Sequence, residues 1–235
     1  LSGLLATLQL SVPVVITFHG SDVNIKKNYI FSRIASRLST TNIFVHQNLS
    51  VKLKLYGAPL NIIPCGFNKN LFFPIPKDTA RKILKWKKNI HYIVFSSAFD
   101  NKIKNVQLAW SSISEMNNCK LVELKGYGKE QINLILNASD LLLVTSLSET
   151  GPIIVKEALA CNCPIISTNV GDVQKLIRNV QNCYISEYNP EDIKKKINLV
   201  FRNNKRTNGE QAIKNFNLEN IAHKVIDVYN TTLDN

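Results

Sequence analysis

Short apolar runs alternate with amphipathic stretches along most of this chain. In the first third, runs rich in β-branched residues predict strands at 12–18, 42–47 and 60–66. Helical spacing predicts helices near 29–39 and 49–56, and Gly57-Ala58-Pro59 is typical of a turn. The pattern therefore predicts strands and helices in alternation from the start of the chain.

The second half repeats this alternation more clearly. Its apolar runs predict strands at 91–97, 120–125, 140–146, 164–169 and 183–186, and the end of the chain predicts helices within 209–231. Apolar strands that alternate with helices indicate a parallel sheet covered on both faces, which is a doubly wound α/β domain. The proline-containing segment 67–77 is interpreted as a linker, so two domains are expected at 1–70 and 71–235.

Composition and charge then narrow the class of protein. The chain has 235 residues with 45% hydrophobic and 20% charged content, which is ordinary for a globular protein. The net charge of +12 favours an anionic partner, without choosing among nucleic acid, a membrane surface and phosphorylated ligands. Lysines concentrate at 80–89 and 191–206, where amphipathic helices with basic outer faces are predicted. A solvated helix face is the simpler interpretation, and contact with an anionic membrane through Trp86 is the sharper one.

Other features indicate location and chemistry. No apolar run approaches the roughly 18 residues of a membrane-spanning helix, so a cytoplasmic protein is expected. A peripheral location on the inner face of the membrane is the alternative. The five cysteines lack zinc-like spacing, and they are interpreted as reduced thiols. No metal site is predicted.

The segment 140–157 carries the most specific chemistry. A predicted buried strand is followed by the loop at Glu149, and Gly151-Pro152 then opens a helix. Ligands of parallel sheets bind at the carboxyl ends of the strands, and the unpaired amides of a helix start attract anions. Glu157 has apolar neighbours three and four positions away, so its carboxylate needs donors, which the two hydroxyls of a ribose could supply.

The whole frame resembles the family-4 glycosyltransferases of the GT-B fold, which have two Rossmann-like domains. The resemblance lies in a glutamate pair separated by seven residues, Glu149 and Glu157, and in the stretch from Glu157 to Ile166, where Asn162 replaces the usual glycine. The "HGSD" at 19–22 and "IIPCGFNKNLF" resemble segments of the same family, and "VFSSAFDNKIKN" resembles its donor-phosphate region. The resemblance covers essentially the whole chain.

The resemblance implies a role for each matching residue. Glu157 would bind the donor ribose, Glu149 the transferred sugar, and Lys104 the departing diphosphate, while His19 would reach the sugar from the first domain. The implied catalytic residues are His19, Lys104 and Glu149. The implied donor-binding residues are Ser96, Ser97, Lys104, Thr150, Gly151, Pro152, Ile153 and Glu157.

The resemblance also implies an activity. A sugar of hexosyl type would move from a nucleotide-diphosphate sugar to a glycan or lipid-linked acceptor, with retention of configuration, in surface polysaccharide or glycolipid synthesis. The donor would be a substrate, and no cofactor is expected. Two departures put donor affinity in question: Ser96, Ser97 and Ala98 stand where the family has a Gly-Arg pair, and Thr150 stands where glycine follows the first glutamate.

Two alternatives belong to other classes. A non-catalytic nucleotide-sugar-binding fragment or sensor would keep the donor site and lose transfer. A nucleic-acid-binding module is disfavoured because the basic residues are not interleaved with aromatic ones and no known motif is present. Because the resemblance begins midway through the family's first domain, residues 1–70 are expected to form an incomplete acceptor-side domain.

Overall fold

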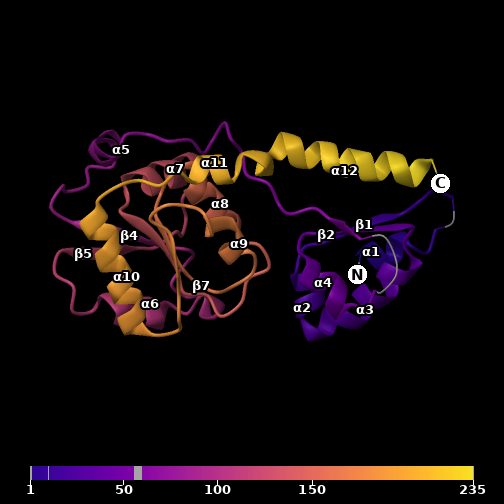
Figure 1. Cartoon of the computed structure of the whole chain (residues 1–235). Coiled ribbons are helices and arrows are strands. Elements are labelled where there is room, and N and C mark those ends of the chain that lie inside the picture. The colour runs from indigo at the N-terminus through magenta and orange to yellow at the C-terminus, as the bar shows by residue number, and fades with distance from the viewer. Residues whose placement is uncertain (1, 10, 56–59, 235) are drawn as a thin grey trace. The chain divides into compact units, whose positions relative to one another are not determined.

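The computed structural model describes residues 2–9, 11–55 and 60–234. The chain divides into two compact units, the first formed by Leu1–Gly66 together with Leu218–Asn235, and the second by Phe67–Asn217. Each unit has its own parallel sheet and its own apolar core, and Figure 1 labels the elements. The predicted α/β fold with parallel sheets is confirmed.

The first unit is built on a three-stranded sheet in the order β1-β2-β3. Its strands are β1 (Val15–Phe18), β2 (Thr41–Phe44) and β3 (Asn61–Ile62). Its first four helices are α1 (Ser2–Ala6), α2 (Ser21–Asn24), α3 (Lys26–Leu38) and α4 (Gln47–Lys52). Phe18 and Phe44 stack with ring centroids 5.1 Å apart, and they form the centre of the core of this unit.

The C-terminal helix α12 (Leu218–Leu233) is grouped with the first unit, whereas the sequence predicted it in the second domain. Near its end, the Thr232 hydroxyl donates a hydrogen bond of 2.9 Å to the Thr41 hydroxyl at the start of β2. This contact joins residues 191 positions apart in the sequence. Helical periodicity gives no sign of such a distant partner.

The second unit contains a five-stranded parallel sheet in the order β5-β4-β6-β7-β8. Its strands are β4 (His91–Phe95), β5 (Cys119–Val122), β6 (Leu141–Val144), β7 (Ile165–Thr168) and β8 (Tyr184–Ser186). Its helices are α5 (Lys77–Ile83), η1 (Lys102–Lys104), α6 (Val106–Ile113), α7 (Lys129–Ala138), α8 (Ile153–Ala160), α9 (Val173–Ile177), α10 (Pro190–Asn203), α11 (Gly209–Ala212) and η2 (Lys214–Phe216).

Successive residues of the central strands enter different cores, as the two-residue period of a strand requires. Leu142 and Val144 of β6 pack in a core with α7, α8 and α9, while Leu141 and Leu143 pack in a core with α6 and α10. All four side chains are fully buried. Helices therefore cover both faces of the sheet, which explains the uninterrupted apolar run of β6.

Each predicted strand corresponds to an observed one, but most of the observed strands are shorter. At 80–89 the predicted amphipathic helix ends at Ile83, and Trp86 stacks on Tyr92 with centroids 4.0 Å apart instead of facing solvent. The predicted linker 67–77 is irregular up to Lys77, but Phe67 and Phe72 are buried in the core of the second unit. The predicted turn at 57–59 lies outside the described residues.

Candidate functional site

The loops that follow β4, β6 and β7 begin at one edge of the second sheet because the strands are parallel. This edge is referred to below as the carboxyl edge. It brings together Lys104 and Glu149, which are paired by a short contact between the Lys104 ammonium and the Glu149 carboxylate. The predicted catalytic lysine and the first predicted glutamate are thus neighbours.

Further hydrogen bonds fix this pair. The Ser146 hydroxyl donates to Glu149 Oε1 at 2.8 Å, and the Thr145 hydroxyl donates to the Lys104 carbonyl at 2.9 Å. The Leu147 amide donates to the Ile103 carbonyl at 2.8 Å. The loop after β4 and the loop after β6 are therefore held together by side-chain and backbone bonds.

Glu157 lies on α8 with only 5% of its side chain exposed. Its Oε1 accepts a hydrogen bond of 2.6 Å from the Lys129 ammonium, and the two side chains form an ion pair. Lys129 begins α7, is half exposed, and its ammonium also lies 5.6 Å from the ring centroid of Phe72. Sequence reasoning predicted that Glu157 needs donors but did not find Lys129. The sequence signal that could have identified Lys129 is its position at the start of a helix that follows a strand, in "GYGKEQ".

Gly151 lies between the two glutamates, just before α8. The helix begins at Ile153 with Pro152 as its N-cap, one position later than predicted, and no side chain among the described residues caps it. Ile153 is exposed, while Thr150 and Gly151 are half-buried. The first turn of α8 therefore has amides that no described side chain caps, which suits an anionic ligand.

Two further predicted residues, Ser96 and Ser97, directly follow β4. The Ser96 hydroxyl is buried and has no hydrogen-bond partner among the described residues, whereas Ser97 is half-buried. The backbones of both pair with neighbouring strands, through the Leu143 carbonyl and the Leu124 amide. Their backbone is therefore fixed, while the Ser96 hydroxyl retains its hydrogen-bonding capacity.

His19 belongs to the first unit and follows β1. Its side chain is exposed, its backbone amide donates to Asp22 at 2.8 Å, and its Nδ1 lies 3.8 Å from Cys65 Sγ. Asp22 therefore closes the His-Gly loop, as an acidic residue at the start of a short helix can. The predicted contact of His19 with a sugar stays a prediction.

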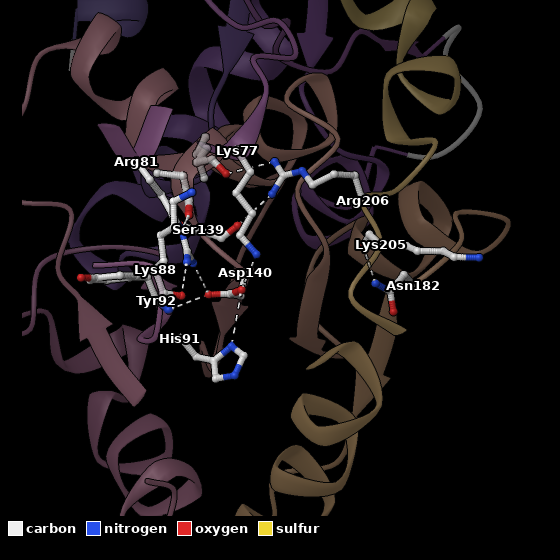
Figure 2. A network of polar contacts seen from close by, with 12 residues as sticks. Lys77, Arg81, Lys88, His91, Tyr92, Ser139, Asp140, Asn182, Lys205 and Arg206 are labelled. Carbon is white, nitrogen blue, oxygen red and sulfur yellow. Dashed lines mark hydrogen bonds and ion pairs between the residues drawn. The ribbon is translucent and has the colours of Figure 1, made fainter. Parts of the chain in front are cut away.

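The opposite, amino edge of the second sheet carries a polar network that sequence reasoning did not find. Figure 2 shows Asp140 surrounded by donors from two other elements, α5 and β4. Lys77 donates to it at 2.5 Å, Arg81 at 2.8 Å and the Tyr92 amide at 2.7 Å, and His91 Nδ1 lies 3.5 Å away. Burial alone would raise the pKa of Asp140, but Lys77, the Tyr92 amide and Arg81 together hold the pKa below its usual value.

Arg206 lies beside this network and donates to three backbone carbonyls. Its guanidinium donates to the carbonyls of Leu136, Ser139 and Cys161 at 2.8–3.1 Å, which ties the segment after α10 to α7 and α8. The carbonyls it satisfies include those left unpaired where helices end. We interpret the amino edge as structural.

The described residues at the two edges contain no cluster of side chains that could hold a metal ion. Among the described residues, no three His, Cys, Asp or Glu side chains gather as metal ligands would. In the same ranges no helix is long and apolar enough to cross a membrane.

Comparison with known proteins gives a family for part of the chain. Residues 111–216 match the family described as Glycosyl transferases group 1. An uncharacterized glycosyltransferase of Methanocaldococcus jannaschii is 26% identical, over 99% of this chain and 72% of the relative. A putative teichuronic acid biosynthesis glycosyltransferase, TuaC of Bacillus subtilis, is 27% identical over 74% of this chain and 51% of its own length.

Solved structures show the fold. Sucrose-phosphate synthase from Thermosynechococcus elongatus matches with a TM-score of 0.82 at 16% identity, covering 97% of this chain and 70% of that one. HepE of Anabaena, solved in complex with UDP and glucose, matches with a TM-score of 0.79 at 16% identity, covering 97% and 74%. The chain therefore has the GT-B fold of these glycosyltransferases, and its second unit carries the region, including Glu149, Gly151 and Glu157, that matches Glycosyl transferases group 1.

Proposed function

We propose that this protein transfers a sugar from a nucleotide-diphosphate sugar to a glycan or lipid-linked acceptor, with retention of configuration. The observation that carries the proposal is the arrangement around Gly151. Glu149 and Glu157 stand on either side of this glycine at the start of α8, and each carboxylate is paired with a lysine. Acids, cations and helix amides at the carboxyl edge of a parallel sheet suit a ligand that has hydroxyls at both ends and a diphosphate between them.

The resemblance to the family-4 glycosyltransferases gives each residue a role that its chemistry allows. Glu157 accepts hydrogen bonds from the two ribose hydroxyls, and Glu149 accepts from the transferred sugar. The amides at Gly151 and Ile153 hold the diphosphate, to which the hydroxyls of Ser96, Ser97 and Thr150 can also donate. The binding of HepE to UDP and glucose supports a donor of this class.

Catalysis would come mainly from stabilising the departing diphosphate. Negative charge develops on the leaving phosphate, and Lys104 together with the amides of α8 is already oriented at this edge. The Lys104 ammonium is paired with the Glu149 carboxylate. A bound diphosphate would therefore share Lys104 with Glu149 or take it over. Recognition of the sugar by Glu149 and stabilisation of the leaving charge by Lys104 would then be coupled.

The acceptor is proposed from the relatives. TuaC is named for teichuronic acid biosynthesis, and WaaG, solved as a glycosyltransferase involved in lipopolysaccharide biosynthesis, matches with a TM-score of 0.67 at 14% identity over 92% of this chain. Both names support an acceptor in surface polysaccharide or glycolipid synthesis. Such acceptors would bring the protein to the inner face of a membrane, as a peripheral cytoplasmic enzyme.

Helix α3 of the first unit supports that location better than the segment around Trp86. Its buried residues are the small Ser32, Ala35 and Ser36, whereas its exposed face carries large apolar side chains. These exposed apolar residues are Ile30, Phe31, Ile34 and Leu38. The helix also contains two lysines and two arginines and no acid, a composition typical of helices that lie on anionic bilayers.

Vesicle sedimentation tests this contact. We expect binding to phosphatidylglycerol vesicles that weakens with salt, and its loss when Ile30 and Ile34 are both changed to Ser. The matched control is Val51→Ser, which removes an equally exposed apolar side chain from α4. Equal binding to neutral phosphatidylcholine vesicles would contradict the proposed charge-assisted contact.

A thermal-shift panel of nucleotide sugars tests the donor site. A ligand present at one hundred times its dissociation constant should stabilise the second unit by about 2.7 kcal/mol. Binding with selectivity for base and sugar supports the proposal, whereas binding that is unselective and lost steeply with salt would favour a nucleic-acid module. A selective binder that transfers no sugar to a membrane extract would favour the sensor.

A further inference from the structure

Lys156 is a fully buried lysine inside α8, one residue before Glu157. Its ammonium lies 3.9 Å from Asp172 Oδ2 and 5.2 Å from the ring centroid of Phe216. A buried ammonium is costly unless it is paired, so the carboxylate and the aromatic face account for its presence. Lys156 points toward the turn before α9, not toward solvent.

That turn lies directly against the Glu149–Gly151 loop. Gly171 has φ +55°, and a Cβ at this position would come within 3.3 Å of Glu149 and Thr150. Gly171 therefore allows both the backbone conformation and the close approach. The neighbouring Asp172 faces Gly151 more loosely, since a Cβ added at Gly151 would lie 3.6 Å from Asp172 Oδ2 and 3.7 Å from Oδ1.

A carboxylate that faces Gly151 creates an electrostatic conflict. The proposed function puts a diphosphate on the backbone at this glycine, and an unpaired negative charge within a few ångströms would repel it. Asp172 Oδ1 is buried and has no hydrogen-bond partner in the described part of the chain, so hydrogen bonds do not disperse its charge there. The ammonium of Lys156, 3.9 Å from Asp172 Oδ2, is the compensating charge that the structure records for this carboxylate.

We propose that Lys156 is a positioning residue that acts through Asp172, and that it keeps the Gly151 loop able to bind an anion. The side chain of Asp172 packs against the Gly151 loop. The positive charge of Lys156 compensates the negative charge that the Asp172 carboxylate brings to this loop. The inference rests on the proposed donor site. It assigns a role to a lysine that can touch no ligand.

Two substitutions that break the same ion pair test this role. Lys156→Met leaves the Asp172 charge uncompensated and should raise the dissociation constant for UDP about tenfold. Asp172→Asn leaves the buried Lys156 ammonium without its carboxylate. This change should lower the dissociation constant for UDP or leave it unchanged. Both variants lose the same contact, so a purely structural role predicts weaker binding in both.

Isothermal titration with UDP and with inorganic pyrophosphate measures these changes, at a temperature where circular dichroism shows each variant folded. Lys175→Met is the matched control, since it removes an exposed lysine from the adjacent helix α9 and should change the constants little. The double variant Lys156→Met/Asp172→Asn should bind nearly as the unchanged protein does. If Lys156→Met does not fold, the double variant is compared with Asp172→Asn and should bind more weakly.

A higher dissociation constant in Lys156→Met, with a lower or unchanged constant in Asp172→Asn, supports the inference. Similar losses in both, or no change in Lys156→Met, would overturn it while leaving the donor site intact. Failure of the unchanged protein to bind either UDP or pyrophosphate would overturn the donor site itself, and the inference with it.

Discussion

The two edges of the sheet in the second unit both pair carboxylates with cations, but they do so in different ways. At the amino edge, Asp140 accepts from Lys77, Arg81 and the Tyr92 amide, and it is buried beside a buried arginine. At the carboxyl edge, Glu157 has one ion-pair partner, the half-exposed Lys129. One carboxylate is saturated with protein donors, and the other keeps capacity for a ligand.

This difference separates a structural network from a binding site better than charge or burial does. Asp140 and Glu157 are both mostly buried acids, and each is paired with a lysine. What differs is that Asp140 has several donors, one of them the buried Arg81, whereas among the described residues the ion-pair partner of Glu157 is a single half-exposed lysine. A lysine that is half exposed contributes little to stability, so a ligand can displace it at low cost.

The largest expected effect is on stability at the amino edge. Asp140→Ala leaves Arg81 buried without its carboxylate, and the free energy of unfolding should fall by about 3–5 kcal/mol. Urea denaturation followed by circular dichroism measures this. Asp78→Ala is the control, since Asp78 pairs with Lys88 at 3.8 Å on the surface and its loss should be hard to detect. Equal effects in both variants would remove the distinction between buried and surface pairs.

At the carboxyl edge we expect the reverse, a loss of binding with little loss of stability. Glu157→Gln removes an acceptor for the ribose hydroxyls and should raise the dissociation constant for UDP about tenfold. Glu130→Gln, on the exposed side of α7, is the control for the change of net charge. A large fall in unfolding free energy with unchanged UDP affinity would make Glu157 a structural residue like Asp140.

A narrower effect is expected for the other glutamate. Glu149→Ala should weaken binding of UDP-glucose about tenfold while leaving UDP affinity within about threefold, since Glu149 is proposed to contact the sugar only. Parallel titrations with the two ligands give the ratio. Equal losses for both would place Glu149 at the nucleotide end of the donor.

The smallest expected effect is a pH dependence of the amino edge. The pKa of Asp140 lies below its usual 3.8, so its charged form stabilises the folded state above that pH, and the stabilisation is lost as the pH falls through the folded-state pKa. The difference in unfolding free energy between the unchanged protein and Asp140→Asn should therefore narrow as the pH is lowered from 7 to below about 4. A difference that is independent of pH would contradict this assignment of charge.

The sequence was sufficient to predict the fold and the carboxyl edge of the second sheet. Buried parallel strands leave apolar runs such as Leu141–Val144, and a helix start after a strand leaves Gly151-Pro152, so the carboxyl edge could be located. The partners of Asp140 lie up to 63 positions away in the sequence. No local sequence pattern predicts that such distant residues come together. Lys156 and the contact of Thr232 with Thr41 were missed for the same reason, whereas Lys129 stands at a helix start that the sequence does mark.

The central claim is that the carboxyl edge of the second unit binds a nucleotide sugar around Gly151. Hydrogen–deuterium exchange of the whole chain, with and without UDP-glucose, tests it directly because both edges are observed in one experiment. We expect slower exchange in peptides covering 147–157 and unchanged exchange in peptides covering 136–141. Slower exchange around Asp140, with none at 147–157, would contradict the account.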